Sequence, residues 1–360
     1  MRNGTRTRTK LVAQALVPFV GAAVLLAGCD PEPEPEMEPD PDPDAAGEWE
    51  SLAPVPEERT EVSVTTDGER VFMMGGFIPP DEDHPEDEVA PAAEDMYAYD
   101  PGADEWENLG PTPGGTHHAG FNHIDGQLYV VGGYEENTFD PSDHVWIYDI
   151  AQEEWSEGEP MPTPRGALAY AVIDGRIHTV GGTVEDIDAL DDDEHNTDSP
   201  DESVGTHEVY DPEDDSWERH APMPTARNHH GGENVDGHFV VTAGRAGGEF
   251  EMTATEVYDP ESGEWEEMAP MPTGRSGVAA EVVGDWFYLF GGETFAEGEE
   301  RTFDEAERYH LEEDRWEELS PMPTARHGLG ATTLNGHIYV VSGGPEPGFA
   351  FGDHNERFTP

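Results

Sequence analysis

Short apolar runs recur along the chain from about residue 45 to the end, each bounded by turn residues. Residues 128–131 (LYVV) and 338–341 (IYVV) are rich in β-branched and aromatic side chains, which is typical of buried strands. An Asp-Gly or Asn-Gly pair precedes each run, at residues 125–126 and 335–336, and such pairs favour two-residue hairpin turns. The pattern therefore predicts antiparallel hairpins of short strands.

The strands belong to a repeat whose internal spacing is fixed. Tryptophans stand at positions 49, 106, 155, 217, 265 and 316, and a small pair ending in glycine begins 26 residues after each of them. An aromatic residue follows at positions 99, 148, 210, 258, 309 and 358, and in five copies the next tryptophan lies seven residues further on. Only the segment between the small pair and the aromatic residue changes in length, from 15 to 29 residues, so one loop per repeat takes up the insertions.

Each repeat accounts for four strands. Residues 208–212 and 256–260 (both EVYDP) predict a third strand that ends in an Asp-Pro turn, and the strand with the tryptophan is the fourth. The 41 glycines and 32 prolines suit tight turns between short strands better than long helices. We therefore expect an all-β protein built from four-stranded antiparallel sheets of about 50 residues each.

The order of these elements resembles the kelch repeat. A glycine pair, a tyrosine before Asp-Pro, a tryptophan and a connecting Met-Pro-Thr-x-Arg segment follow one another over residues 45–360. The resemblance implies a six-bladed β-propeller. The chain ends at the third strand of the sixth repeat, residues 356–358, whereas Trp49 belongs to a fourth strand with no repeat before it. We therefore predict that the N-terminal strand closes the last blade.

The first 28 residues differ from the repeats and predict a signal peptide. Four cations precede an apolar run of 17 residues at positions 11–27. A run of this length is near the lower limit for a transmembrane anchor, and Gln14, Pro18 and Gly21 weaken that alternative.

The sole cysteine closes this segment. Residues 26–29 (LAGC) resemble the lipobox of bacterial lipoproteins, which implies cleavage before Cys29 and a lipid on the new N-terminus. Residues 30–44 (DPEPEPEMEPDPDPD) alternate proline with acid, so they predict an extended tether between the lipid and the propeller. We expect a protein of the bacterial cell envelope, periplasmic or on the cell surface, that contacts the membrane through Cys29.

The charge of the chain restricts its partners and its environment. After Cys29 the sequence contains 13 arginines, no lysine and 81 acids, which gives a formal charge of −68. Nucleic acid is excluded as a partner, because both surfaces are strongly negative. A surface this acidic without lysine indicates adaptation to high salt, where counterions screen the repulsion. We expect a monomer.

Two acidic tracts offer an alternative in which the acids bind cations. Asp188–Glu194 lies in the longest variable loop and Asp81–Asp83 in the second longest, but neither has the spacing of an EF-hand. We therefore expect no cofactor, with calcium in these tracts as the alternative.

The repeated arginine lies ten residues after the tryptophan. It is present in five repeats, as Arg59, Arg165, Arg227, Arg275 and Arg326, and is replaced by Thr116 in the second. In the last four of these repeats a glutamate stands two residues before the aromatic position, as Glu208, Glu256, Glu307 and Glu356. This pattern predicts ion pairs within each blade. Arg59 has Tyr97 where the glutamate would be, so Arg59, with Glu61 and Tyr97 near it, is the best candidate for an unpaired, ligand-binding arginine.

Histidines follow the same position in alternate repeats, as His117, His118, His229 and His327. We expect them, as ligand-binding candidates, around the mouth of the channel. Their offsets from the arginine differ, so we expect no metal site. Glu136, Asp140 and His144 resemble the iron ligands of plant specifier proteins of the kelch group, but acids are so abundant that a chance match is unsurprising.

Two classes of function fit these features. The first is a non-catalytic propeller on a lipid-anchored tether that binds a protein or carbohydrate ligand, and we favour it over an enzyme. The second is a carbohydrate-active propeller that resembles sialate epimerases. Galactose-oxidase-like copper chemistry needs a Tyr-Cys crosslink, and no cysteine follows Cys29. The epimerase hypothesis requires arginine, histidine and acidic side chains that converge on the channel. Arg59, Glu61, His118 and His229 are the residues that could meet this requirement, and they are weak evidence for it.

Overall fold

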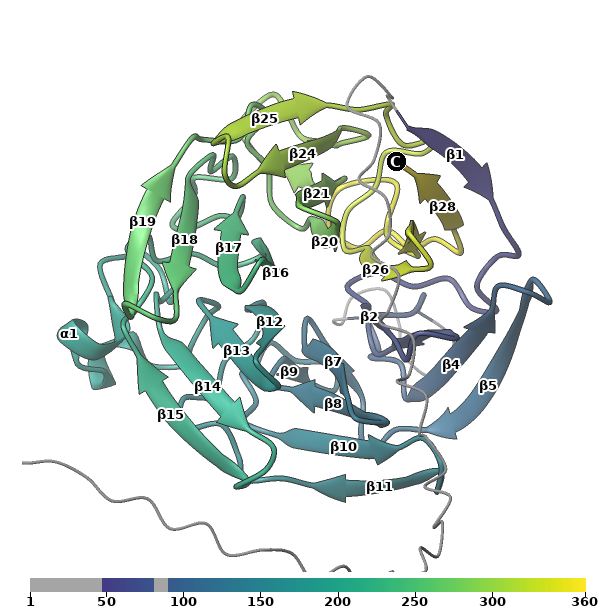
Figure 1. Ribbon diagram of the computed structural model, residues 1–360, viewed down its shortest axis with the longest axis horizontal. Helices are drawn as coiled ribbons and strands as arrows, with labels where there is room; N and C mark the ends of the chain where they lie inside the picture. Colours follow the sequence, from purple (N-terminus) through teal and green to yellow (C-terminus); the bar gives the residue numbers. More distant parts are fainter. Residues whose placement is uncertain (1–46, 81–89) are drawn as a thin grey trace, which may run out of the picture. The chain divides into compact units, whose positions relative to one another are not determined.

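The computed structural model describes residues 47–80 and 90–360. In these residues, six four-stranded antiparallel sheets lie as blades around a central channel (Figure 1). In blades one to five the first strand in sequence lies beside the channel and the fourth lies outermost. The predicted six-bladed, all-β propeller is confirmed.

The strands follow one another in chain order. Blade one consists of β2 (Ser63–Thr66), β3 (Val71–Met74), β4 (Asp95–Asp100) and β5 (Glu105–Pro111). Blade two consists of β7 (Gly120–Ile124), β8 (Gln127–Val131), β10 (Val145–Asp149) and β11 (Glu154–Glu157). Blade three consists of β12 (Ala169–Ile173), β13 (Arg176–Val180), β14 (His207–Asp211) and β15 (Ser216–His220). Blade four consists of β16 (Gly231–Val235), β17 (His238–Thr242), β18 (Thr255–Asp259) and β19 (Glu264–Met268). Blade five consists of β20 (Ala279–Val283), β21 (Trp286–Phe290), β24 (Ala306–His310) and β25 (Arg315–Glu318). Blade six consists of β26 (Gly330–Leu334), β27 (His337–Val341), β28 (Asn355–Thr359) and, from the start of the chain, β1 (Glu48–Ser51).

Short elements extend the loops between the second and third strands. Two small sheets pair β6 (Thr116–His117) with β9 (Tyr134–Glu135) and β22 (Glu293–Thr294) with β23 (Arg301–Thr302). The longest described loop, in blade three, holds the 3-10 segment η1 (Ile187–Ala189) and the single helical turn α1 (Asp192–His195).

The repeated tryptophans join neighbouring blades. Nε1 of Trp106 donates to the backbone oxygen of Ala53 at 3.1 Å, and Nε1 of Trp265 donates to that of Ala221 at 2.9 Å. Trp265 also packs on Tyr258 of its own blade, with 5.3 Å between the ring centroids. Five of the six repeated tryptophans thus combine apolar packing with a hydrogen bond to the preceding blade, which explains their fixed place in the repeat.

The N-terminal strand closes the ring, as predicted. β1 pairs antiparallel with β28, and Trp49 lies opposite Phe358, with 4.9 Å between the ring centroids. Nε1 of Trp49 donates to the backbone oxygen of Ser320 at 3.0 Å, so Trp49 makes the same contact as the tryptophans within the ring. The sheet of blade six therefore combines both ends of the repeat region.

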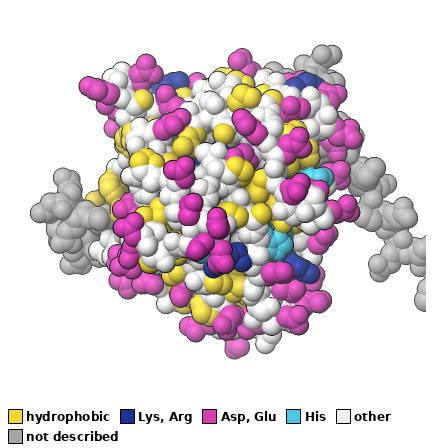
Figure 2. Space-filling model, turned by 90° about the vertical axis from the view of Figure 1, so that its left-hand side faces the viewer, with side chains coloured by type: hydrophobic (Ala, Val, Ile, Leu, Met, Phe, Trp, Pro, Cys, Tyr) yellow, Lys and Arg dark blue, Asp and Glu magenta, His cyan; other side chains and the backbone are white. Residues whose placement is uncertain are grey.

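The outer surface carries the charge that the composition indicates. Figure 2 shows acidic side chains spread over the visible face of the molecule, with few cationic ones between them. No helix among the described residues is both long and apolar enough to cross a membrane. The predicted signal peptide, Cys29, the tether and the acidic tract Asp81–Asp83 lie outside the described residues.

Candidate functional site

Four of the repeated arginines are structural. Their side chains are buried, and each pairs with the glutamate of the third strand of its own blade, as predicted. The pairs are Arg165 with Glu208 at 3.0 Å, Arg227 with Glu256, Arg275 with Glu307 at 2.5 Å and Arg326 with Glu356 at 2.7 Å.

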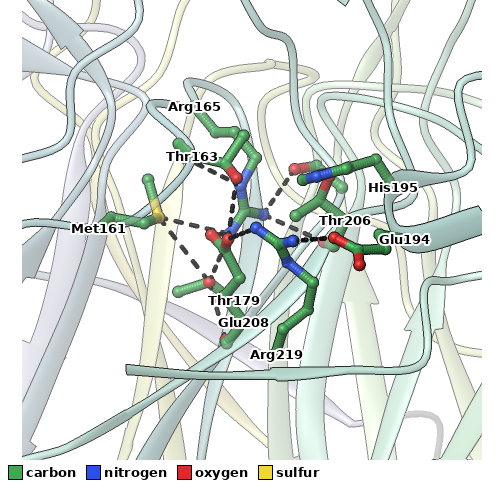
Figure 3. Close-up of polar contacts among 10 residues, drawn as sticks. Met161, Thr163, Arg165, Thr179, Glu194, His195, Thr206, Glu208 and Arg219 are labelled. Carbon is green, nitrogen blue, oxygen red and sulfur yellow. Dashed lines mark hydrogen bonds and ion pairs between the residues drawn. The ribbon is translucent and has the colours of Figure 1, made fainter. Parts of the chain in front are cut away.

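In blade three, the guanidinium group of Arg165 donates hydrogen bonds to several partners at once (Figure 3). Nη1 of Arg165 donates to the backbone oxygens of Gly181 at 2.9 Å and Thr206 at 3.2 Å. Glu208 also accepts from Arg219 at 3.2 Å. Because buried charges require such compensation, these arginines hold the loops of the blade together.

Arg59 is not the unpaired arginine that the sequence indicated. Its side chain is buried, and Nη1 donates to the backbone oxygens of Gly75 at 3.1 Å and Asp95 at 3.0 Å. Nη2 pairs with Glu57 at 2.8 Å, and the guanidinium carbon lies 5.0 Å from the ring centroid of the buried Tyr97. A glutamate two residues before the arginine takes the place of the third-strand glutamate. Arg59 and Tyr97 therefore belong to the scaffold of blade one.

One residue per blade forms a ring at the end of the channel where the innermost strands begin. These six residues, which we call the mouth ring, lie two positions after the arginine position and have φ between 53° and 68°: Glu61, His118, Ala167, His229, Gly277 and Gly328. Backbone hydrogen bonds run from blade to blade, such as Gly277 N to His229 O at 2.9 Å, and Val62 N to Gly328 O closes the circle at 3.3 Å. The backbone of the ring thus fixes where these side chains begin.

Three kinds of residue occupy the mouth ring: glycine, the alanine of blade three, and ionisable residues. Blades five and six place glycine there, for which a left-handed φ costs nothing, whereas other residues lose roughly 1–2 kcal/mol. Blades one, two and four nevertheless carry Glu61, His118 and His229. Ionisable side chains at positions that glycine fits better indicate a functional site.

The side chains of these three residues meet. His118 Nε2 lies 3.0 Å from Glu61 Oε2, and the rings of His118 and His229 are 4.8 Å apart between centroids. His327 Nε2 approaches the other oxygen, Oε1 of Glu61, at 3.6 Å. Burial would raise the pKa of Glu61, but the three facing histidines outweigh it and hold this pKa well below its usual range. The predicted gathering of histidines around the mouth is thus confirmed, with an ionised carboxylate at its centre.

His117 lies beneath this group. It is fully buried, its Nδ1 is 2.6 Å from Nδ1 of His118, and its Nε2 is 2.8 Å from the backbone oxygen of Thr138. Burial, with a smaller effect of His118, lowers the pKa of His117 well below its usual range, so the ring is neutral. His117 therefore acts on the site by orienting His118.

Sequence reasoning missed Arg245 and Glu293. Nη1 of Arg245 pairs with Oε1 of Glu293 at 2.9 Å, Nη2 of Arg245 lies 2.9 Å from His229 Nε2, and Glu293 Oε2 lies 3.5 Å from His327 Nε2. Both residues follow the small pair directly, where the backbone pairs with the residue after the repeated arginine. Their fixed offset from the small pair could have identified them, but the loop of variable length begins at the same position and hides this regularity. We call Glu61, His118, His229, Arg245, Glu293 and His327 the mouth cluster.

An aromatic patch adjoins the mouth cluster. Phe139 and Phe349 are 49% and 55% exposed, and among the described residues they are the large hydrophobic side chains that solvent reaches most. Their rings lie 5.9 Å and 5.3 Å from that of the buried Phe77, and Phe139 lies 5.4 Å from His117. The patch of Phe77, Phe139 and Phe349 therefore spans the loops of blades one, two and six beside the mouth.

The channel behind the mouth encloses about 400 Å³ and contains a second pair of acids. Glu233 and Glu281 lie on the innermost strands of adjacent blades. Burial raises the pKa of Glu281 to about 7, and burial together with the charge of Glu281 raises that of Glu233 well above its usual range.

Two other candidate groups do not come together. Among the described residues, sets of three His, Cys, Asp or Glu ligand atoms within 4.8 Å of one another occur around Glu61 and not at Glu136, Asp140 and His144. His144 instead stacks on Trp146, with 3.8 Å between ring centroids. The tract Asp188–Glu194 forms no such set either.

Comparison with known sequences identifies the family. A kelch-motif model matches residues 115–162, 226–272 and 274–323, and a second kelch-motif model matches residues 164–224. Together these segments cover more than half of the chain and fall on blades two to five. The chain belongs to the kelch-repeat family.

Individual relatives of this kelch propeller are distant. It is similar to Kelch repeat and BTB domain-containing protein 12 of Danio rerio (30% identity over 87 residues) and to Kelch-like protein 15 of Danio rerio (41% over 44 residues). The matches cover 24% and 12% of this chain but only 14% and 7% of those proteins. A solved structure titled "Structure of YjhT" superposes with a TM-score of 0.69 at 18% identity, covering 84% of this chain and 95% of the other. At this identity the likeness shows the fold alone.

Proposed function

We propose that this kelch propeller is a binding module that holds a partner protein on the face where the channel opens. The observation that carries the proposal is the aromatic patch, because Phe139 and Phe349 are exposed on separate loops beside a pocket. Exposed aromatic side chains at the centre of a surface are typical anchors of protein interfaces.

The charge around the patch indicates the chemistry of the partner. Glu135, Glu136 and Asp140 are exposed around Phe139, and Glu346 is exposed near Phe349. A partner segment with an apolar side chain between basic residues would complement this surface in both respects.

A random peptide library displayed on phage tests this proposal. We expect the full chain to enrich peptides that combine an apolar residue with Arg or Lys. A double variant, Phe139→Ala with Phe349→Ala, should bind them at least tenfold more weakly, as a loss of about 1.4 kcal/mol implies. Phe250→Ala, a loop aromatic in blade four, is the matched control. Equal binding by the double variant, or no enrichment, would contradict the proposal.

The second candidate is a carbohydrate-active propeller. The mouth cluster favours it, because an acid, histidines and an arginine converge beside a cavity. A glycan array distinguishes the two candidates. Chemical conversion of a bound glycan by the full chain that disappears in Glu61→Gly but persists in the double phenylalanine variant would support the enzyme class.

We further propose that the propeller is displayed in the cell envelope on a lipid-anchored tether. The support is the sequence of residues 1–44, with its apolar run, Cys29 and the proline-rich acidic segment. Cys29→Ser should release the protein from membrane fractions or block its processing. A variant that fractionates and migrates like the unaltered chain would contradict the anchor.

A further inference from the structure

Hydrogen bonds determine which nitrogen of His118 carries the proton. The backbone oxygen of Thr138 can only accept, so His117 donates to it through Nε2 at 2.8 Å. With the proton of His117 on Nε2, its Nδ1 accepts from Nδ1 of His118 at 2.6 Å. In the neutral ring, Nε2 of His118 therefore directs a lone pair at Glu61 Oε2, 3.0 Å away. Two acceptors would then face each other at hydrogen-bond distance unless a cation, a proton or a metal ion, lies between them.

The same reasoning applies to His229. Nδ2 of Asn228 donates to Oγ of Ser203 at 2.6 Å, which leaves Oδ1 of Asn228 facing Nδ1 of His229 at 2.5 Å. Nδ1 of His229 therefore donates, and Nε2 carries the lone pair. Nη2 of Arg245 donates to Nε2 of His229 at 2.9 Å, so this nitrogen carries no proton. A second imidazole thus presents Nε2 to the mouth of the channel.

We propose that Glu61, His118 and His229 bind one divalent transition-metal ion through a carboxylate oxygen and the two Nε2 atoms. The three ligand atoms lie within 4.8 Å of one another. Metal bonds of about 2.0–2.2 Å place neighbouring ligands roughly 3–3.5 Å apart, which fits the 3.0 Å between Glu61 and His118. Two imidazoles and a carboxylate suit Zn²⁺ or Fe²⁺ and leave coordination positions open toward the channel.

The surroundings support the ligands in the manner of metal sites. Ligating histidines usually donate their other ring nitrogen to a fixed acceptor, and His117 and Asn228 supply these acceptors. Glu293 adds a second buried carboxylate beside Glu61, with His327 between the two. The three ligands also occupy left-handed mouth-ring positions, so the binding of an ion compensates for the strain they impose.

Two other cations compete for the same lone pairs. A proton on His118 would turn its contact with Glu61 into an ion pair, and Arg245 already donates to Nε2 of His229 at 2.9 Å. Metal binding therefore has to displace the Arg245 hydrogen bond. The inference goes beyond the proposed partner binding and does not depend on it, because the ion itself is the probe.

Zn²⁺ titration of the chelator-treated full chain in molar KCl tests the proposal, with a chromophoric indicator as competitor. The high salt screens the surface acids. We expect one tightly bound equivalent, and visible d–d bands when Co²⁺ replaces Zn²⁺. Glu61→Gly, His118→Gly and His229→Gly should each weaken binding by more than about 100-fold, the upper end of the loss for an outer-shell partner. Asn228→Ala should weaken it by roughly 10–100-fold.

The mouth ring provides a matched control. Ala167→Gly makes the same kind of substitution at the equivalent position of blade three, where no ligand side chain is present, and should leave binding unchanged. Glycine already occupies this position as Gly277 and Gly328, so the ligand variants are expected to fold. Absence of a stoichiometric Zn²⁺ equivalent in the unaltered chain would overturn the site. Unchanged Zn²⁺ uptake by Glu61→Gly and His118→Gly would also overturn the site. The ion would then bind to surface acids, and the contact between Glu61 and His118 would be an ion pair with a proton on the histidine.

Discussion

One left-handed residue in each blade decides what chemistry the mouth of this propeller offers. The backbone at these positions is nearly identical in all six blades, with φ from 53° to 68°. The side chains differ, because blades one, two and four have Glu61, His118 and His229 where blades five and six have Gly277 and Gly328. Local strain and converging ionisable groups therefore coincide at the same residues.

The arginines provide a test at the same scale. Arg227→Ala should lower the free energy of unfolding by about 3 kcal/mol or more, because it leaves Glu256 buried without its partner. Arg59→Ala should cost less, since Glu57 is 39% exposed and can be solvated. The exposed Arg176→Ala should stay within about 0.5 kcal/mol. Urea unfolding in molar NaCl, followed by tryptophan fluorescence, measures all three.

The expected loss in free energy of unfolding is largest for Arg227→Ala, smaller for Arg59→Ala and smallest for Arg176→Ala. If Arg59→Ala were as harmless as Arg176→Ala, Arg59 would not be part of the scaffold, and its role as a ligand-binding residue would have to be reconsidered.

At the scale of elements, β1 completes the ring. Trp49 makes the contacts of an internal tryptophan, so Trp49→Ala should cost about 3 kcal/mol, as Trp265→Ala should within blade four. Glu48→Ala, on the exposed side of β1, is the control and should be nearly neutral. A small effect of Trp49→Ala beside a large effect of Trp265→Ala, in the same urea experiment, would show that the ring does not depend on its closing strand.

The adjacent strands β16 and β20 introduce a pH dependence through Glu233 and Glu281. Both carboxyls have pKa values above the usual range in the folded chain, that of Glu281 at about 7. The folded state therefore binds more protons than the unfolded state between about pH 4.5 and 7, and stability falls as the pH rises through this window. The neutral histidines such as His117 act in the opposite direction, so the test is the difference from the unaltered chain: Glu233→Gln with Glu281→Gln should raise the melting temperature at pH 8 relative to that at pH 5. The same dependence of melting temperature on pH in both proteins would contradict the role of this pair.

At the scale of the whole molecule, charge sets the conditions under which the ring is stable. The chain after Cys29 has a formal charge of −68, and the acids cover the visible surface (Figure 2). The screening length falls from about 10 Å at 0.1 M salt to about 3 Å at 1 M, so self-repulsion should decrease over this range. We expect the melting temperature to rise steeply between these concentrations of NaCl. A flat response would contradict adaptation to high salt.

The sequence was sufficient to predict the fold. The constant 26 residues from tryptophan to small pair, and the repeated Tyr-Asp-Pro, predicted six four-stranded repeats, and the resemblance to the kelch repeat implied a propeller that β1 closes. The same spacing predicted the four ion pairs, including Arg165 with Glu208. These features are predictable because they involve hydrogen bonding and packing within one blade or between two adjacent blades, and each blade repeats the same local geometry.

The candidate site required the tertiary structure. The sequence indicated histidines at the mouth, but the meeting of His118 from blade two with His229 from blade four depends on the radius of the closed ring. Arg245 and Glu293 lie at a fixed offset from the small pair, but this offset does not show that their side chains meet His229 and His327. Even the nearby partner of Arg59, Glu57, was hidden, because many acids are close in sequence and only side-chain packing selects one. The sequence by itself determined the blades, and closure of the ring decided which side chains share the mouth of the channel.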